Sequence, residues 1–172
     1  MRSIGFVLAF TLLVAPAAQA AKFKVVGPSK LTSVKQQNVI KMWNQITRGE
    51  CDAGYKAVCI ISKKPTERWE QTIKQVLWGN YVESISAAKT SSSKKSITSA
   101  VNAVFDAHGA LSQKPQAVRS KLANALYDAV KAGKCQVYTG GIQGAFDGDY
   151  THVTVRTPKT NQLFSIYAGY SE

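Results

Sequence analysis

Two alternating segments near the C-terminus, 149–157 and 162–168, constrain the fold more than any other part of the chain. Apolar and polar residues alternate along both, which is the pattern of a β-strand with one buried face, and four loop residues separate them. The pattern predicts a β-hairpin in which Thr157 pairs with Gln162. This register places four apolar residues on one face, which needs a core beneath it: Val153, Val155, Phe164 and Ile166.

The opposite face of the predicted hairpin is polar. Its members are Tyr150, His152, Thr154, Arg156, Ser165 and Tyr167. We expect helices to cover the apolar face and the polar face to look outward or into a cleft. The polar face is therefore the first place to look for a functional site.

The rest of the chain predicts the fold class. Apolar residues recur at helical spacing, between cap and breaker residues, in four segments: 33–49, 65–79, 97–109 and 115–133. Short apolar runs typical of strands occupy three more: 22–26, 57–61 and 135–139. We predict an α+β fold, with helices in the first two-thirds packing on a C-terminal antiparallel β-sheet that ends in the hairpin.

Three connecting segments are less regular. Residues 81–89 fit a strand or a helix, and 90–95 are polar enough to predict a flexible linker. The glycine-rich segment 140–148 predicts a wide turn or bulge between strands. It lacks both GxxxxGK[ST] and GxGxxG, so it is not a phosphate-binding loop.

The N-terminus has the pattern of a secretory signal peptide. Arg2 precedes the apolar run 4–14, and Ala18-Gln19-Ala20 is an A-x-A cleavage site. We expect cleavage after Ala20, no transmembrane segment after that cleavage, and a single secreted or periplasmic domain over 21–172.

The chain is strongly basic, with 22 Lys and Arg against 10 Asp and Glu and a formal net charge of +12. Removing Arg2 with the signal peptide leaves +11. This charge predicts an anionic partner, which could be nucleic acid, lipopolysaccharide or anionic lipid, acidic polysaccharide, or an acidic protein. Lysine outnumbers arginine, which disfavours base-specific reading of nucleic acid. The charge could also serve solubility alone.

Three cysteines, Cys51, Cys59 and Cys135, allow three single pairings. A Cys51–Cys59 disulfide closes the shortest loop, and loop closure would stabilise the fold by about 2–3 kcal/mol. Cys135 would then be a buried free thiol at the start of a strand. Neither a CxxC motif nor a Cys/His cluster is present, so the sequence predicts no metal site, and it predicts no cofactor.

His152 is the main catalytic candidate. In the predicted register it lies opposite Tyr167 and near Thr154 and Ser165, with Arg156 one pleat further. A histidine can transfer protons near neutral pH, and an arginine can stabilise an oxyanion, as metal-independent phosphodiester cleavage requires. The layout of helices followed by an antiparallel sheet is similar to that of barnase-like and EndoU-like ribonuclease toxins, although the chain shows no family motif.

Other residues of the chain offer alternatives to this site. His108 lies on an apolar helical stripe and fits a core histidine, but it could pair with His152 as a second proton carrier. Cys51, His152 and Asn161 follow the order of a papain-type cysteine hydrolase, although disulfide formation competes for Cys51. Asp147 and Asp149 share one loop and do not predict a glycosidase pair.

Two lysine pairs precede predicted helices, Lys63-Lys64 and Lys94-Lys95. With Tyr150 they are candidates for non-specific contacts to an anionic partner, and as solvated loop charges they would need no function. The sequence as a whole therefore favours a secreted basic protein that binds an anionic partner. The alternatives are a ribonuclease-like phosphodiesterase and a papain-type cysteine hydrolase.

Overall fold

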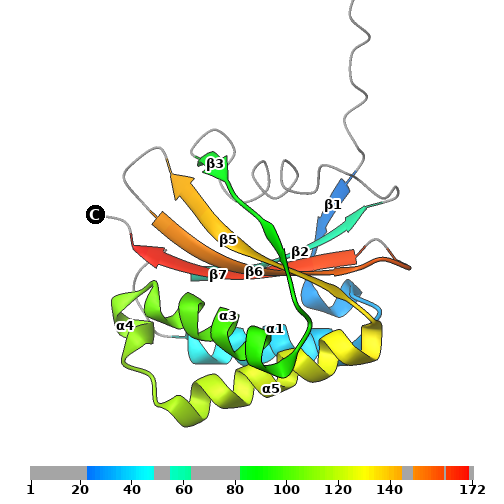
Figure 1. The fold of residues 1–172 in the computed structure, drawn as a ribbon. Coiled ribbons are helices and arrows are strands. Elements are labelled where there is room, and N and C mark those ends of the chain that lie inside the picture. The colour runs from blue at the N-terminus through cyan, green and yellow to red at the C-terminus, as the bar shows by residue number, and fades with distance from the viewer. Residues whose placement is uncertain (1–22, 49–54, 63–81, 145–148, 161, 171–172) are drawn as a thin grey trace, which may run out of the picture.

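A computed structural model describes residues 23–48, 55–62, 82–144, 149–160 and 162–170. One antiparallel sheet lies over a layer of helices that all cover the same face (Figure 1). The helical elements are η1 (Pro28–Lys30), α1 (Val34–Ile46), α3 (Lys94–Asp106), α4 (Gly109–Ser112) and α5 (Gln116–Gly133). The strands are β1 (Phe23–Val26), β2 (Tyr55–Ser62), β3 (Val82–Ile85), β4 (Ala88–Thr90), β5 (Gln136–Gly144), β6 (Asp149–Thr157) and β7 (Gln162–Tyr170).

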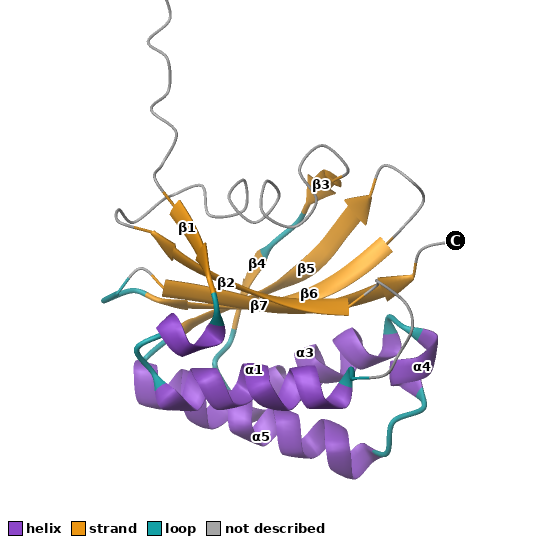
Figure 2. Cartoon of the chain, turned by 180° about the vertical axis from the view of Figure 1, so that it is seen from behind, coloured by secondary structure: helices purple, strands orange, loops and turns teal. Residues whose placement is uncertain are grey.

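The predicted α+β class is confirmed, and the sheet extends beyond its C-terminal part. The strand order is β1-β2-β7-β6-β5-β3, and β4 pairs with the other half of β5. The early strands β1 and β2 thus complete the sheet on the far side of β7, while residues 82–90, which fitted either structure, form β3 and β4. Seen from behind, α1, α3 and α5 again lie beneath one face of this sheet (Figure 2).

The hairpin β6–β7 has the register that the alternation predicts. Thr157 pairs with Gln162, and Val155 with Phe164. The four apolar side chains of its inner face are fully buried against residues of α1, α3 and α5. At the centre of this core the rings of Trp43 and Phe105 meet edge to face, with centroids 5.8 Å apart. The hairpin is therefore held by burial of one whole face.

Serine caps set where two of the helices begin. The Ser33 side chain accepts a hydrogen bond from the Gln36 backbone N–H, and Ser93 accepts one from Ser96. The expected flexible linker over 90–95 is wrong in extent, because Thr90 ends β4 and helix α3 already begins at Lys94.

The end of α5 also differs from the prediction. The predicted helical segment ends at Gly133, a residue type favoured at helix C-termini, but the C-cap is the next residue, Lys134, in the left-handed conformation (φ 48°). Gly133 is still required, because a Cβ there would overlap the sulfur of Cys135. Cys135 itself is a buried free thiol directly before β5, as predicted.

The expected glycine-rich turn over 140–148 is wrong at its start, because Gly140 and Gly141 lie inside β5. The β3–β4 connection crosses the strand there, and a Cβ on Gly140 would overlap the backbone carbonyl of Ser86. Glycine is therefore present for close approach of two backbone segments rather than for a turn. Four predicted features lie outside the described residues: the signal peptide, Gly49, Cys51 and the helix over 65–79.

Candidate functional site

The polar face of the hairpin is buried, which corrects the expectation that it looks outward or into a cleft. His152, Thr154, Ser165 and Tyr167 are each 0% exposed, and Tyr150 is 7% exposed. Strand alternation places these side chains on the face opposite the helices. Both faces of the hairpin are thus inside the molecule.

A chain of hydrogen bonds runs through this buried face. His152 Nε2 lies 2.9 Å from the carbonyl oxygen of Ser86 and donates to it, because a carbonyl can only accept. His152 Nδ1 lies 3.0 Å from Thr154 Oγ1, which in turn donates to Ser165 Oγ at 2.9 Å. The absence of a side chain at Gly140, directly opposite His152, leaves room for both the imidazole and the Ser86 carbonyl.

The protonation state of His152 sets the direction of this chain. When the ring is charged, Nδ1 donates a hydrogen bond to the Thr154 hydroxyl, and that hydroxyl donates its own hydrogen bond to Ser165. When the ring is neutral, Nδ1 accepts a hydrogen bond from the Thr154 hydroxyl, and the Ser165 hydroxyl then donates to Thr154 instead of accepting from it. Burial lowers the pKa of His152 from its ordinary value of 6.5, while the hydrogen bond to the Ser86 backbone raises it by less. Burial therefore favours the neutral ring at neutral pH.

Two tyrosines extend the buried face. The rings of Tyr150 and Tyr167 meet edge to face with centroids 6.1 Å apart. Burial, with a smaller contribution from Tyr150, raises the pKa of Tyr167 above its ordinary value of 10. Within the described part of the chain, the Tyr167 hydroxyl has no hydrogen-bond partner. Tyr167 therefore stays protonated and cannot serve as a base.

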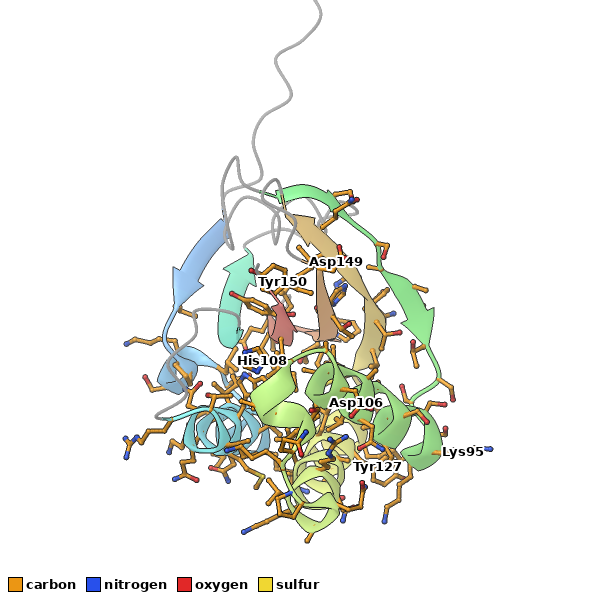
Figure 3. All side chains as sticks on the ribbon, turned by 90° about the vertical axis from the view of Figure 1, so that its left-hand side faces the viewer. Lys95, Asp106, His108, Tyr127, Asp149 and Tyr150 are labelled. Carbon is orange, nitrogen blue, oxygen red and sulfur yellow. The ribbon has the colours of Figure 1, made fainter. Side chains whose placement is uncertain are left out.

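Arg156 and His108 are not brought to His152. The half-buried Arg156 donates from Nη1 to Gln136 Oε1 at 3.4 Å, and Tyr138 donates to the same oxygen at 3.1 Å. His108 is buried at the N-cap of α4, as a core histidine should be, and lies in the helical layer (Figure 3). The sheet separates it from the imidazole of His152, so the two do not form an acid–base pair.

The remaining predicted site residues lie at the surface or outside the described chain. Lys94 and Lys95 are exposed at the start of α3, and Figure 3 shows Lys95 extending away from the helix. Asp149 is exposed at the start of β6. Cys59 is in β2, but its proposed partner is not described. Five candidates lie outside the described residues: Cys51, Lys63, Lys64, Asp147 and Asn161.

A different surface carries most of the charge of the protein. We define the helical layer as residues 28–48 and 94–134, which contain η1, α1, α3, α4 and α5. It holds eleven lysines and arginines against two aspartates. Nine of the eleven basic residues are exposed: Lys30, Lys35, Lys41, Arg48, Lys94, Lys95, Lys121, Lys131 and Lys134. Such an excess attracts anions over the whole layer.

One of the two aspartates is already neutralised. Asp106 accepts a hydrogen bond from the buried Arg119 guanidinium at 2.6 Å. Arg119 also donates to the backbone oxygens of Ser112 and Lys114 and lies 5.2 Å above the Phe105 ring centroid. This pair joins α3 to the start of α5 and leaves the exposed lysines largely unopposed.

Two lysine-lined cavities lie where α1 and α5 meet. The first, about 460 Å³, is at the start of α1 and the end of α5, and is lined by Lys35, Lys134 and Lys159 with the hydroxyl residues Thr32, Thr157 and Thr160. The second, about 360 Å³, is at the end of α1 and the start of α5, and is lined by Met42, Gln45, Ile46, Lys114, Val118 and Lys121. We call them the Lys35 cavity and the Lys121 cavity.

A third cavity, about 600 Å³, lies between α3 and the sheet. It is lined by Lys95 and by small or hydroxyl-bearing residues, among them Thr90, Ser99 and Thr139. His152 also borders it, but both ring nitrogens are engaged with Ser86 and Thr154. The third cavity therefore does not expose a free imidazole.

The lysines of the two cavities were not among the candidates predicted from the sequence, because they do not form adjacent pairs as Lys94 and Lys95 do. A count of charge along the predicted helices would have found them, since α1 carries Lys35 and Lys41 and no acidic residue. The meeting of Lys35, Lys134 and Lys159 depends on tertiary structure, because they come from α1, the α5 C-cap and the β6–β7 turn.

Among the described residues, no His, Cys, Asp or Glu side chains gather into a group that could hold a metal ion. None of the described helices is both long and apolar enough to cross a membrane. No protein-family model matches the chain, and neither curated proteins nor solved structures gave a match.

Proposed function

We propose that the protein binds an anionic macromolecule through the helical layer. The observation that carries the proposal is the charge of that layer, eleven basic residues against two aspartates, of which one is paired with Arg119. Exposed lysines on α1, α3 and α5 give a broad positive surface rather than a single ion pair. When such a surface neutralises a polyanion, the counterions of the polyanion are released, and this release favours binding.

The buried polar face of the hairpin supports a structural role better than a catalytic one. Its histidine is hydrogen-bonded at both ring nitrogens, and its tyrosine keeps its proton. A phosphodiesterase needs a proton carrier and a cation beside one reacting group, but Arg156 bonds Gln136 instead. The charge of the helical layer is therefore the better basis for a function.

The test measures binding of fluorescently labelled heparin, as a generic polyanion, over a series of salt concentrations. Affinity should fall linearly on logarithmic axes as salt rises, because counterion release drives binding. Lys41→Gln on α1 should reduce the steepness of that fall by about one for each lost contact. Lys89→Gln on β4 removes the same charge from an exposed site outside the helical layer and should change little. Equal effects of the two variants, or no binding at low salt, would contradict the proposal.

A further inference from the structure

The two lysine-lined cavities lie at opposite ends of the contact between α1 and α5. The first turn of α1 meets the last turn of α5 at the Lys35 cavity, and the last turn of α1 meets the first turn of α5 at the Lys121 cavity. The helices are therefore antiparallel neighbours, and we call the line where they meet the α1–α5 seam. The two cavities are the ends of this seam.

The length of α1 sets the separation of the cavities. Helix α1 has 13 residues. At a rise of 1.5 Å per residue it separates the two ends by about 20 Å. A small anion can therefore occupy one cavity only, whereas a long chain molecule can occupy both at once.

We propose that the partner is a linear acidic polysaccharide that lies along the α1–α5 seam with anionic groups in both cavities; this rests on the proposed function. The Lys35 cavity offers three ammonium groups beside the hydroxyl of Thr160. The hydroxyls of Thr32 and Thr157 also line it, although Thr32 already donates to Gln162 and Thr157 already accepts from Gln36. The Lys121 cavity offers the ammonium group of Lys121 beside the amide of Gln45, and Lys114 also lines it. Lysines bind sulfate or carboxylate groups, and the hydroxyls and the amide match the hydroxyls of sugars.

The composition of the seam disfavours the other polyanions. Single-stranded nucleic acid is held partly by stacking of its bases on aromatic side chains, but Trp43 and Phe105 of the helical layer are buried and Tyr127 is half-buried. Insertion into a membrane surface needs exposed apolar side chains, and among the described residues Val34 is the only large hydrophobic one that is exposed. A polysaccharide requires neither feature.

Binding at two sites predicts a dependence on ligand length. A heparin disaccharide can fill one cavity, whereas a decasaccharide can reach across about 20 Å. Joining two weak contacts in one ligand raises affinity by about 100-fold or more without a new contact. The decasaccharide should therefore bind the full chain at least about 100-fold more tightly than the disaccharide. A smaller gain would contradict the two-cavity arrangement.

Variants at each end test the seam directly. Lys35→Gln with Lys159→Gln removes two of the three lysine charges of one cavity, and Lys121→Gln removes a charge from the other. Each of these variants should lose most of the increase in affinity from disaccharide to decasaccharide. Disaccharide binding at the unmodified cavity should remain. The matched control is Lys94→Gln with Lys95→Gln, which removes two exposed charges from α3, outside the seam. Melting temperatures of all variants should match that of the unmodified protein, since surface substitutions cost little stability.

The outcomes separate this inference from the proposed function. If the α3 variant loses as much affinity as the Lys35 variant, the charge acts as a diffuse layer and the seam is wrong, while anion binding stands. If single-stranded RNA, or vesicles of anionic lipid, bind more tightly than the decasaccharide at equal salt, the polysaccharide is the wrong partner. If none of the three probes binds at low salt, both proposals fail.

Discussion

The β6–β7 hairpin buries both of its faces, but it fills them with different chemistry. The inner face packs Val155 and Phe164 against the helices, and these hydrophobic contacts do not depend on the relative orientation of the groups. The outer face holds His152, Thr154 and Ser165 in a chain of hydrogen bonds whose donors and acceptors must match. The comparison teaches that alternation along a strand assigns a residue to a face without saying whether that face meets water.

The largest expected effect is on the apolar face. Phe164→Ala removes a side chain that is 0% exposed at the centre of the core. Loss of burial plus the remaining cavity should lower the free energy of unfolding by about 3–5 kcal/mol. Urea unfolding followed by circular dichroism measures this, and the turn variant Thr160→Ala should stay within about 0.5 kcal/mol of the unmodified protein. A tolerated Phe164→Ala would show that the inner face is not the main core.

The next effect is on the polar face. His152→Ala leaves the Ser86 carbonyl and the Thr154 hydroxyl buried without their partner, which should cost about 2–3 kcal/mol. His152→Gln keeps an N–H donor and should recover part of that loss. The same unfolding experiment compares the two variants. Full stability of His152→Ala would mean that the outer face is exposed in solution.

Of the two faces of the hairpin, only the polar one carries a histidine, so only that face should respond to mild acid. Because burial lowers the pKa of His152 in the folded state below its ordinary value of 6.5, the unfolded chain takes up the proton more readily. This contribution to stability is complete above about pH 6.5 and is lost progressively as the pH falls below it. The melting temperature should drop more steeply between about pH 7 and about pH 5 for the unmodified protein than for His152→Gln. Parallel curves would exclude titration of this histidine.

The smallest effect distinguishes two tyrosine hydroxyls. Tyr167→Phe removes a buried hydroxyl that has no partner within the described part of the chain, so stability should stay the same or rise by up to about 1 kcal/mol. Tyr138→Phe removes a hydroxyl that donates to Gln136, and should cost about 1 kcal/mol. Thermal melts of the pair measure the difference. A clear loss for Tyr167→Phe would reveal a partner for its hydroxyl.

The sequence predicted local features and missed those that depend on tertiary contact. Period-two alternation was enough to place Val155 opposite Phe164, and the helical spacing of apolar residues was enough to locate α1. Burial of His152 was not predictable, because its hydrogen-bond partner, the Ser86 carbonyl, lies 66 positions earlier in the sequence. The role of Gly140 was not predictable either, because a glycine that leaves room for a crossing backbone looks the same in sequence as a glycine in a turn. The lysines of the α1–α5 seam were not predicted as a group, because they come from separate elements that only the tertiary structure brings together.

The position of β7 has a consequence for how the chain reaches its fold. This strand pairs with β2 on one side and with β6 on the other, and Tyr55 meets Ala168 from far along the chain. Contacts of such long sequence separation slow folding, because the entropy of a large loop must be lost before the strand pairing can stabilise the chain. Until β7 is in place, β1–β2 and β5–β6 are separate pieces with unpaired edges open to other chains. Deleting this one strand would therefore divide the sheet in two, and refolding from denaturant should be limited by its insertion.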